Sequence, residues 1–158
     1  MTATEQAIEL VRNAAEAASD KLADNIIAFD VSDQLIITDA FVLCSAPNDR
    51  QVRSIVDAVE ERLRAAGAKP VRREGERDGR WVLLDYGDIV VHVQHEEERL
   101  YYSLERIWRD CPVIPLPETV TSGQGAQAGP QGGGSAGADS ATAGGTARGS
   151  YGGGDAGR

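Results

Sequence analysis

Two histidines and two aspartates in the middle of the chain have side chains that could bind a metal ion or act in acid–base catalysis. His92 and His95 lie in one apolar run, and Asp85 and Asp88 flank the short segment before it. Side chains three positions apart on a strand point to opposite faces, so the histidines cannot reach one metal ion without a bend. Aspartates at a tight turn usually accept bonds from nearby backbone amides, which favours a turn role over an acid–base pair. We therefore expect no metal site and no cofactor, with His92 hydrogen-bonded on a sheet face and His95 at a solvent-exposed strand end.

Other reactive or phosphate-binding patterns are incomplete. Cys44 lies in an apolar run with no cationic neighbour in sequence to activate its thiol, and Cys111 precedes a proline. The two cysteines lack Cys-x-x-Cys spacing and are expected to be buried or incidental thiols. Gly75 and Gly79 are not followed by Lys-Ser/Thr and do not open a helix, so they do not form a phosphate loop. No catalytic set assembles from these residues.

An aromatic and acidic segment stands out instead. Trp81 and Tyr86 lie among apolar residues next to the carboxylates of Asp85 and Asp88. An aromatic anchor beside charged groups is typical of the centre of a protein–protein interface. A tryptophan that opens a strand is also often a core residue, and the pattern alone leaves both interpretations open.

Length and composition limit the architecture to one domain with an appendage. The chain has 158 residues, and 14 of its 18 glycines lie after residue 120. A Gly/Ala/Ser-rich segment cannot bury enough apolar surface to offset the entropy of ordering. We expect a folded domain at 1–120 and a disordered tail at 121–158 that is dispensable for folding and function.

The charge of the folded part restricts its partners. The four charges after residue 120 cancel, so the whole formal charge of -9 falls on residues 1–120. Phosphate binding needs clustered Lys and Arg, so direct recognition of nucleic acid is not expected, and a basic protein is the more natural partner. The chain has no stretch of 18 apolar residues and no basic, apolar leader, which predicts a cytoplasmic protein without a membrane segment.

Two helices that would support this segment can be predicted from their first residues. Thr2 and Glu5 form a Thr-x-x-Glu capping pattern ahead of apolar residues spaced three and four apart, which predicts a helix at 4–19. Asn48, with Gln51 three positions on, predicts the cap of a second helix at 49–66, which would end at Gly67.

The strands follow from β-rich runs and turn residues. The turn sequence Asp85-Tyr-Gly-Asp88 joins two such runs and predicts an antiparallel hairpin over 80–95 in which Gly87 has a positive φ. A last helix is expected from Glu96, with an apolar stripe of Leu100, Leu104, Ile107 and Trp108 that ends before Cys111. With strands at 25–33 and 40–46 and a short edge strand at 69–73, the order predicts a small α/β domain with a mixed sheet.

Several separated motifs resemble one known family. The run WVLLDYGDIVVHV at 81–93, followed by RLYYSLERIW at 99–108, is similar to the signature of the ribosomal silencing factors, also called RsfS or Iojap-like proteins. Further matches in order and spacing are Asp30, TDAFVLCSA at 38–46, RQV at 50–52 and Glu74-Gly75. The similarity covers about residues 4–110 and does not include the tail.

The resemblance implies both a fold and a function. The fold would be an α/β domain with a mixed sheet of five strands flanked by helices, nucleotidyltransferase-like but without the catalytic residues. The protein would be no enzyme: it would bind the large ribosomal subunit through ribosomal protein L-fourteen and block joining of the small subunit, repressing translation when nutrients are limiting. A homodimer is also compatible with the family.

The partner-binding positions of the family fall on Trp81, Asp85 and Tyr86. Relatives have Leu at the position of Tyr86 and a bulky apolar residue at that of Gln94, so the chain departs from the pattern at both positions. Two alternatives remain open: a factor that assembles the large subunit, and a nucleotide-binding enzyme that retains the pocket of the fold.

Overall fold

The computed structural model describes residues 2–120, and the predicted tail at 121–158 lies outside them. Nine helices and strands follow one another in this part of the chain. They are α1 (Glu5–Asp20), β1 (Asp24–Asp30), β2 (Ala40–Ala46), α2 (Asp49–Ala65), β3 (Arg72–Glu74), β4 (Trp81–Asp85), β5 (Ile89–His95), α3 (Glu96–Tyr102) and α4 (Leu104–Ile107).

The five strands form one mixed sheet in the order β1-β2-β5-β4-β3. β2 and β5 run parallel, whereas the β1–β2, β4–β5 and β3–β4 pairs are antiparallel. Gly87 has a φ of +85° in the β4–β5 turn, and β3 is an edge strand. The expected α/β class, the mixed sheet of five strands and the hairpin are therefore confirmed.

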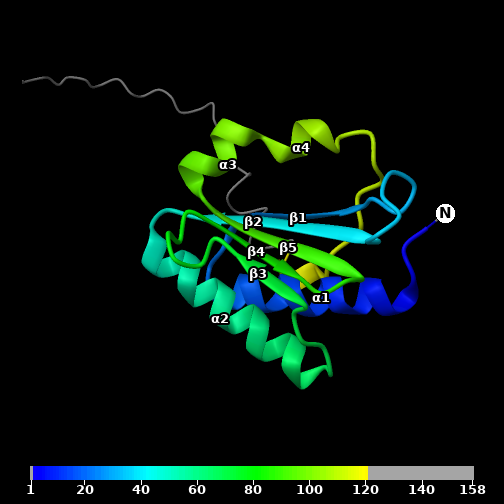
Figure 1. Cartoon of the computed structure of the whole chain (residues 1–158), viewed down its shortest axis with the longest axis horizontal. Coiled ribbons are helices and arrows are strands. Elements are labelled where there is room, and N and C mark those ends of the chain that lie inside the picture. Colours follow the sequence, from blue (N-terminus) through cyan, green and yellow to red (C-terminus); the bar gives the residue numbers. More distant parts are fainter. Residues whose placement is uncertain (1, 121–158) are drawn as a thin grey trace, which may run out of the picture. The chain divides into compact units, whose positions relative to one another are not determined.

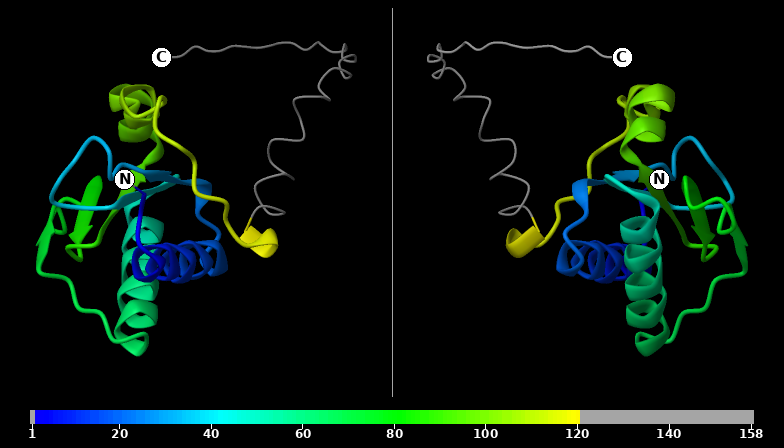
Figure 2. Two further views of the ribbon diagram at one scale, coloured as in Figure 1. Left: turned by 90° about the vertical axis from the view of Figure 1, so that its right-hand side faces the viewer. Right: turned by 90° about the vertical axis from the view of Figure 1, so that its left-hand side faces the viewer.

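Helices cover the sheet unequally on its two sides. α1 and α2 lie together against one side, while the short helices α3 and α4 lie on the other (Figures 1 and 2). The main core fills the space between the sheet and α1 with α2. It includes Val11, Val42, Ile55, Val59, Leu63, Leu84, Ile89, Val91 and Val93.

Helix α1 begins at Glu5, but its cap differs from the predicted one. Thr4, not Thr2, accepts the bond from the N–H of Ala7, at 3.0 Å. The N–H groups of Ala3 and Thr4 donate to the carboxylates of Asp30 and Asp39, and Thr4 has extended backbone. Contacts to distant residues therefore move the cap two positions along the chain.

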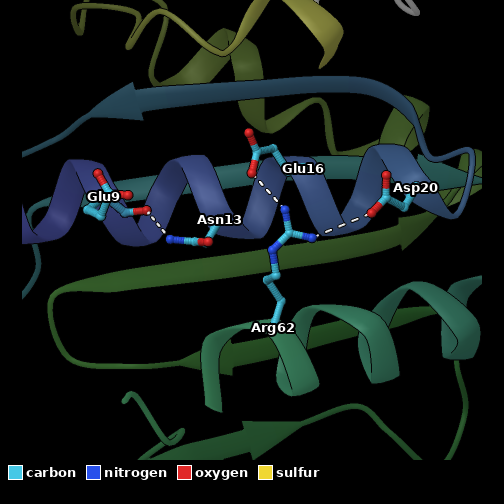
Figure 3. A network of polar contacts seen from close by, with 5 residues as sticks. All are labelled: Glu9, Asn13, Glu16, Asp20 and Arg62. Carbon is cyan, nitrogen blue, oxygen red and sulfur yellow. Dashed lines mark hydrogen bonds and ion pairs between the residues drawn. The ribbon is translucent and has the colours of Figure 1, made fainter. Parts of the chain in front are cut away.

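Helix α2 has the predicted cap and is tied to α1. The Asn48 side chain accepts from the N–H of Gln51 at 2.9 Å, as expected. Between the helices, the Arg62 guanidinium donates to Glu16 at 2.7 Å and reaches Asp20 at 3.5 Å (Figure 3). These partly exposed ion pairs add to the apolar contacts that orient the two helices.

The last helix is broken in two, and this corrects the prediction of one helix with a buried stripe. Ser103 adopts φ +48° and separates α3 from α4. Of the predicted stripe, Leu104 and Trp108 pack on a second apolar cluster, whereas Leu100 and Ile107 are exposed. Because the break interrupts the helical spacing, the four residues of the predicted stripe do not share one buried face.

The second apolar cluster lies on the α4 side of the sheet. Its buried members are Phe29, Val31, Leu43 and Cys111. Cys111 and Cys44 are both buried free thiols, and burial raises the pKa of Cys44 to about 12. Both cysteines are therefore buried thiols, which agrees with the expectation of buried or incidental thiols. Within residues 2–120, no helix has the length and apolar character to cross a membrane.

Candidate partner-binding face

The face of the hairpin that points away from the main core carries Trp81. Val82 and Leu84 of β4 enter the main core, so Trp81, Leu83 and Asp85 point to the opposite side of the sheet. All three are half-buried. The short helices cover only part of this side, so the structure leaves an aromatic, an aliphatic and an acidic side chain partly open to solvent.

Six aromatic rings form a continuous row across this side of the sheet. The centroid distances run from 4.8 Å, between Trp81 and Tyr102, to 6.1 Å, between Trp81 and His92. This aromatic row consists, in order, of Tyr101, Tyr102, Trp81, His92, Phe41 and Trp108. Aromatic rings in contact supply a large apolar surface with few rotatable bonds, which suits an interface centre.

His92 fixes the orientation of the tryptophan. The Trp81 Nε1–H donates to His92 Nδ1 at 3.2 Å, and only 6% of His92 is exposed. Burial lowers the pKa of His92 to about 4, so the imidazole is neutral and can accept this bond. The expected position of His92 on a sheet face is confirmed and Nδ1 is hydrogen-bonded, but the buried Nε2 has no partner among the described residues, and the bond to Trp81 had no signal in the sequence.

A glycine holds the backbone of Trp81 close to the preceding loop. Gly75 has a φ of +83°, and a Cβ at this position would collide with the carbonyl oxygen of Trp81. Glycine is therefore required directly after β3, which gives a physical reason for the Glu74-Gly75 pair.

Asp85 combines a turn role with a position on the candidate face. Its Oδ1 accepts from the N–H of Gly87 at 2.9 Å, and its Oδ2 lies 3.4 Å from Arg72 Nη2. The turn role expected for this aspartate is confirmed. About a fifth of the side chain, 21%, remains exposed, so the carboxylate lies at the surface beside Leu83.

Tyr86 lies apart from the other two predicted partner-binding residues. It is 8% exposed and belongs to the main core on the opposite side of the sheet. Burial, with a smaller contribution from the nearby Glu60, raises the pKa of its phenol to about 12. The structure therefore brings Trp81 and Asp85 to one face, while Tyr86 anchors the turn from behind.

The titratable residues at the end of β5 and the start of α3 are paired with a backbone amide or with Arg80. His95 Nδ1 accepts from the N–H of Glu97 and caps α3. Within residues 2–120, His95, Glu97 and Glu98 are the one group with ligand atoms close enough to hold a metal ion. The Arg80 guanidinium already lies 2.7 Å from Glu97 and 2.9 Å from Glu98 and supplies the positive charge there.

A buried arginine fastens α3 and α4 beside the candidate face. The Arg99 guanidinium donates to the Asn25 carbonyl at 2.7 Å, to Glu105 at 2.8 Å and, more weakly, to the Ser45 hydroxyl at 3.4 Å. It is the one buried residue of α3, and α4 has none. Sequence patterns could not reveal this role, because Arg99 joins residues 74 and 54 positions away.

Replacing Arg99 with methionine is expected to lower the free energy of unfolding by about 2 kcal/mol, because bonds to a buried charged group are lost. Chemical denaturation measures this change. Arg106→Met removes an exposed guanidinium from the same segment and should change the stability by less than about 0.5 kcal/mol. Equal stability of the Arg99 variant and the unmodified chain would contradict the anchoring role.

The sequence and the fold both match one family. The family model described as "Ribosomal silencing factor during starvation" matches residues 4–140. The chain belongs to the ribosomal silencing factor family. It is 36% identical over 113 residues to the ribosomal silencing factor RsfS of Halalkalibacterium halodurans, covering 72% of this chain and 97% of that protein. It is 38% identical to that of Bacillus subtilis, covering 68% and 91%.

Solved structures agree with the family. The structure of a Chromobacterium violaceum protein matches with a TM-score of 0.62 at 35% identity. The match covers 63% of this chain and 83% of that protein. A Bacillus halodurans protein has a TM-score of 0.61 at 36% identity, with 98% of it covered by 68% of this chain. The fold, the Iojap-like relationship and a role in translation regulation therefore follow from the ribosomal silencing factor family.

Proposed function

We propose that this ribosomal silencing factor binds the large ribosomal subunit through ribosomal protein L-fourteen and thereby blocks joining of the small subunit. The observation that supports this proposal most is the face of β4, on which Trp81, Leu83 and Asp85 are partly exposed. Trp81 is held by His92 and Tyr102 before any partner binds, which reduces the entropy lost on association. Tyr86 contributes by fixing the turn behind Asp85.

Charge supplies an orientation for this encounter. Residues 1–120 carry the whole formal charge of -9, so ribosomal RNA repels the domain while a basic protein surface attracts it. The carboxylate of Asp85 lies directly beside the apolar surface of β4. Attraction and repulsion together favour the approach in which this face meets the protein partner.

The proposed mechanism is steric and needs no catalysis. A domain of about 120 residues is roughly 30 Å across by the scaling of compact proteins, and a body of this width on the joining face would keep the small subunit from docking. The protein would act in the cytoplasm as a regulator and not as an enzyme. A homodimer through the exposed apolar surface stays a prediction.

Raising the ionic strength is expected to slow association with the large subunit, because screening weakens the attraction between an acidic domain and a basic partner. Stopped-flow measurements from about 0.05 to 0.3 M salt should show the association rate constant falling by about tenfold. The dissociation rate constant should change much less. An association rate that is independent of salt would show that the interface is purely apolar.

Light scattering of mixed ribosomal subunits tests the proposed block. Adding the protein to large subunits before small subunits should reduce the amount of joined ribosomes in proportion to the large subunits occupied. Full joining on saturated large subunits would contradict the steric mechanism. Ribosome profiles during growth and starvation separate silencing from large-subunit assembly, since an assembly factor changes precursor particles during growth.

A further inference from the structure

Two isoleucines on the loop between β1 and β2 are exposed to a degree that is unusual for aliphatic side chains. Ile36 is 100% exposed and Ile37 is 83% exposed. Single exposed apolar residues are common on protein surfaces, but adjacent ones beside further apolar surface indicate contact with a partner.

The loop that carries these isoleucines is held in place on both sides of them. The N–H groups of Gln34 and Leu35 donate to the Val31 carbonyl, and the Val31 N–H donates to the Asp39 carbonyl at 2.9 Å. Leu35 packs against the second apolar cluster, and Thr38 is buried. The isoleucines are therefore presented by an anchored loop while contributing little to the core.

The position of the loop makes it continuous with the candidate partner-binding face. Leu35 packs on the same apolar cluster as Phe41 and Trp108, which form one end of the aromatic row. The N–H of Asp39 donates to the carbonyl of Asp88 at 2.9 Å and ties the loop to the β4–β5 turn beside Asp85. The isoleucines thus lie at the turn end of the face, and Tyr101 and Tyr102 lie at the opposite end.

Acidic residues accompany the loop. Asp33 and Asp88 are both exposed, one on the loop itself and one on the turn bonded to it. The loop therefore combines an aliphatic tip with negative charge, which fits a protein surface that has an apolar hollow bordered by Lys or Arg. Nucleic acid would be repelled by these carboxylates and offers no comparable aliphatic hollow.

We infer that Ile36 and Ile37 form a second anchor for the same basic protein partner that contacts Trp81. This inference rests on the proposed function, since it extends the proposed face. Trp81 would contact the partner from the sheet. The isoleucines would enter an apolar hollow of the partner that lies opposite the turn end of the face. Two separated anchors define the orientation of the domain on the partner, which one aromatic contact cannot do.

The test is the affinity of the double variant Ile36→Ser, Ile37→Ser for purified large subunits, measured by co-sedimentation. Losing two buried aliphatic contacts is expected to weaken binding by about tenfold or more. Because both side chains are exposed in the free protein, the thermal unfolding temperature should stay the same. Leu22→Ser is the matched control: Leu22 is 76% exposed and directly follows the C-cap of α1, the helix that lies on the other side of the sheet from α3 and α4, and its loss should leave binding unchanged.

The possible outcomes distinguish a failure of the second-anchor inference from a failure of the proposed function. If the unmodified protein binds large subunits and the double variant binds equally well, the second anchor is wrong while the proposed function stands. If the unmodified protein does not bind, the proposed function fails. If the double variant instead dissociates a homodimer in sedimentation velocity and keeps its subunit affinity, the loop joins two copies of this chain, which overturns the inference.

Discussion

Trp81→Ala is expected to weaken binding to the large subunit by about thirtyfold or more, the effect of losing about 2 kcal/mol at an interface hot spot. Trp81 is half-buried, with its ring in tilted contact with Tyr102. The free protein should lose less stability than it would from losing a core tryptophan, because the main core lies on the other side of the sheet. Titration of labelled protein with large subunits measures the affinity, and thermal unfolding measures the fold.

Trp81→Phe provides the matched control for this substitution. Phenylalanine keeps a ring against Tyr102 but cannot donate to His92, so the affinity should fall between those of the unmodified protein and the alanine variant. Loss of the cooperative unfolding transition in Trp81→Ala would show that Trp81 is a core residue. The assignment of the partner-binding face would then be wrong.

The free energy of unfolding is expected to fall by about 3 kcal/mol on account of His92 as the pH drops from about 6.5 to about 4. Burial lowers the pKa of His92 in the folded protein to about 4, below its value of about 6.5 in the unfolded chain. Between these values the unfolded chain binds more protons, so acid favours unfolding. Protonation at Nδ1 also removes the acceptor for the Trp81 Nε1–H.

Denaturant unfolding at several pH values, compared between variants, isolates this contribution from that of the carboxylates. The stability of the unmodified protein changes between pH 7 and pH 4.5 because both His92 and the carboxylates titrate. His92→Gln should remove most of the part of this change that the carboxylates do not cause. His95→Gln replaces the other histidine of the chain, away from Trp81, and serves as the control for loss of an imidazole. Identical pH profiles for the His92 variant and the unmodified protein would contradict a buried, neutral imidazole.

Elements specified by local chemistry could be predicted from the sequence. The β4–β5 hairpin follows from the positive φ that Gly87 allows and from the bond that Asp85 accepts two residues on. Helix α2 follows from the Asn48 cap and the spacing of its apolar residues. In these cases each decisive contact lies within a few residues along the chain, so the sequence contains the whole signal.

Features decided by distant contacts could not be predicted. The break between α3 and α4 accompanies the bonds of Arg99 to Asn25 and Ser45, and the α1 cap shifts because Asp30 and Asp39 hold the backbone before it. For the candidate site, the family resemblance names Trp81, Asp85 and Tyr86 together, whereas alternation along β4 in the structure places only Trp81 and Asp85 on one face. Alternation cannot place Tyr86, because it ends where the strand enters the turn.

The most direct test of the account is co-sedimentation of the protein with purified large ribosomal subunits, with isolated small subunits as the control. We expect the protein to travel with large subunits and to stay at the top of the gradient with small subunits. Isolated ribosomal protein L-fourteen added in excess should compete it away from the large subunit. A protein that stays at the top of the gradient with large subunits, or that L-fourteen does not displace, would contradict the proposed function.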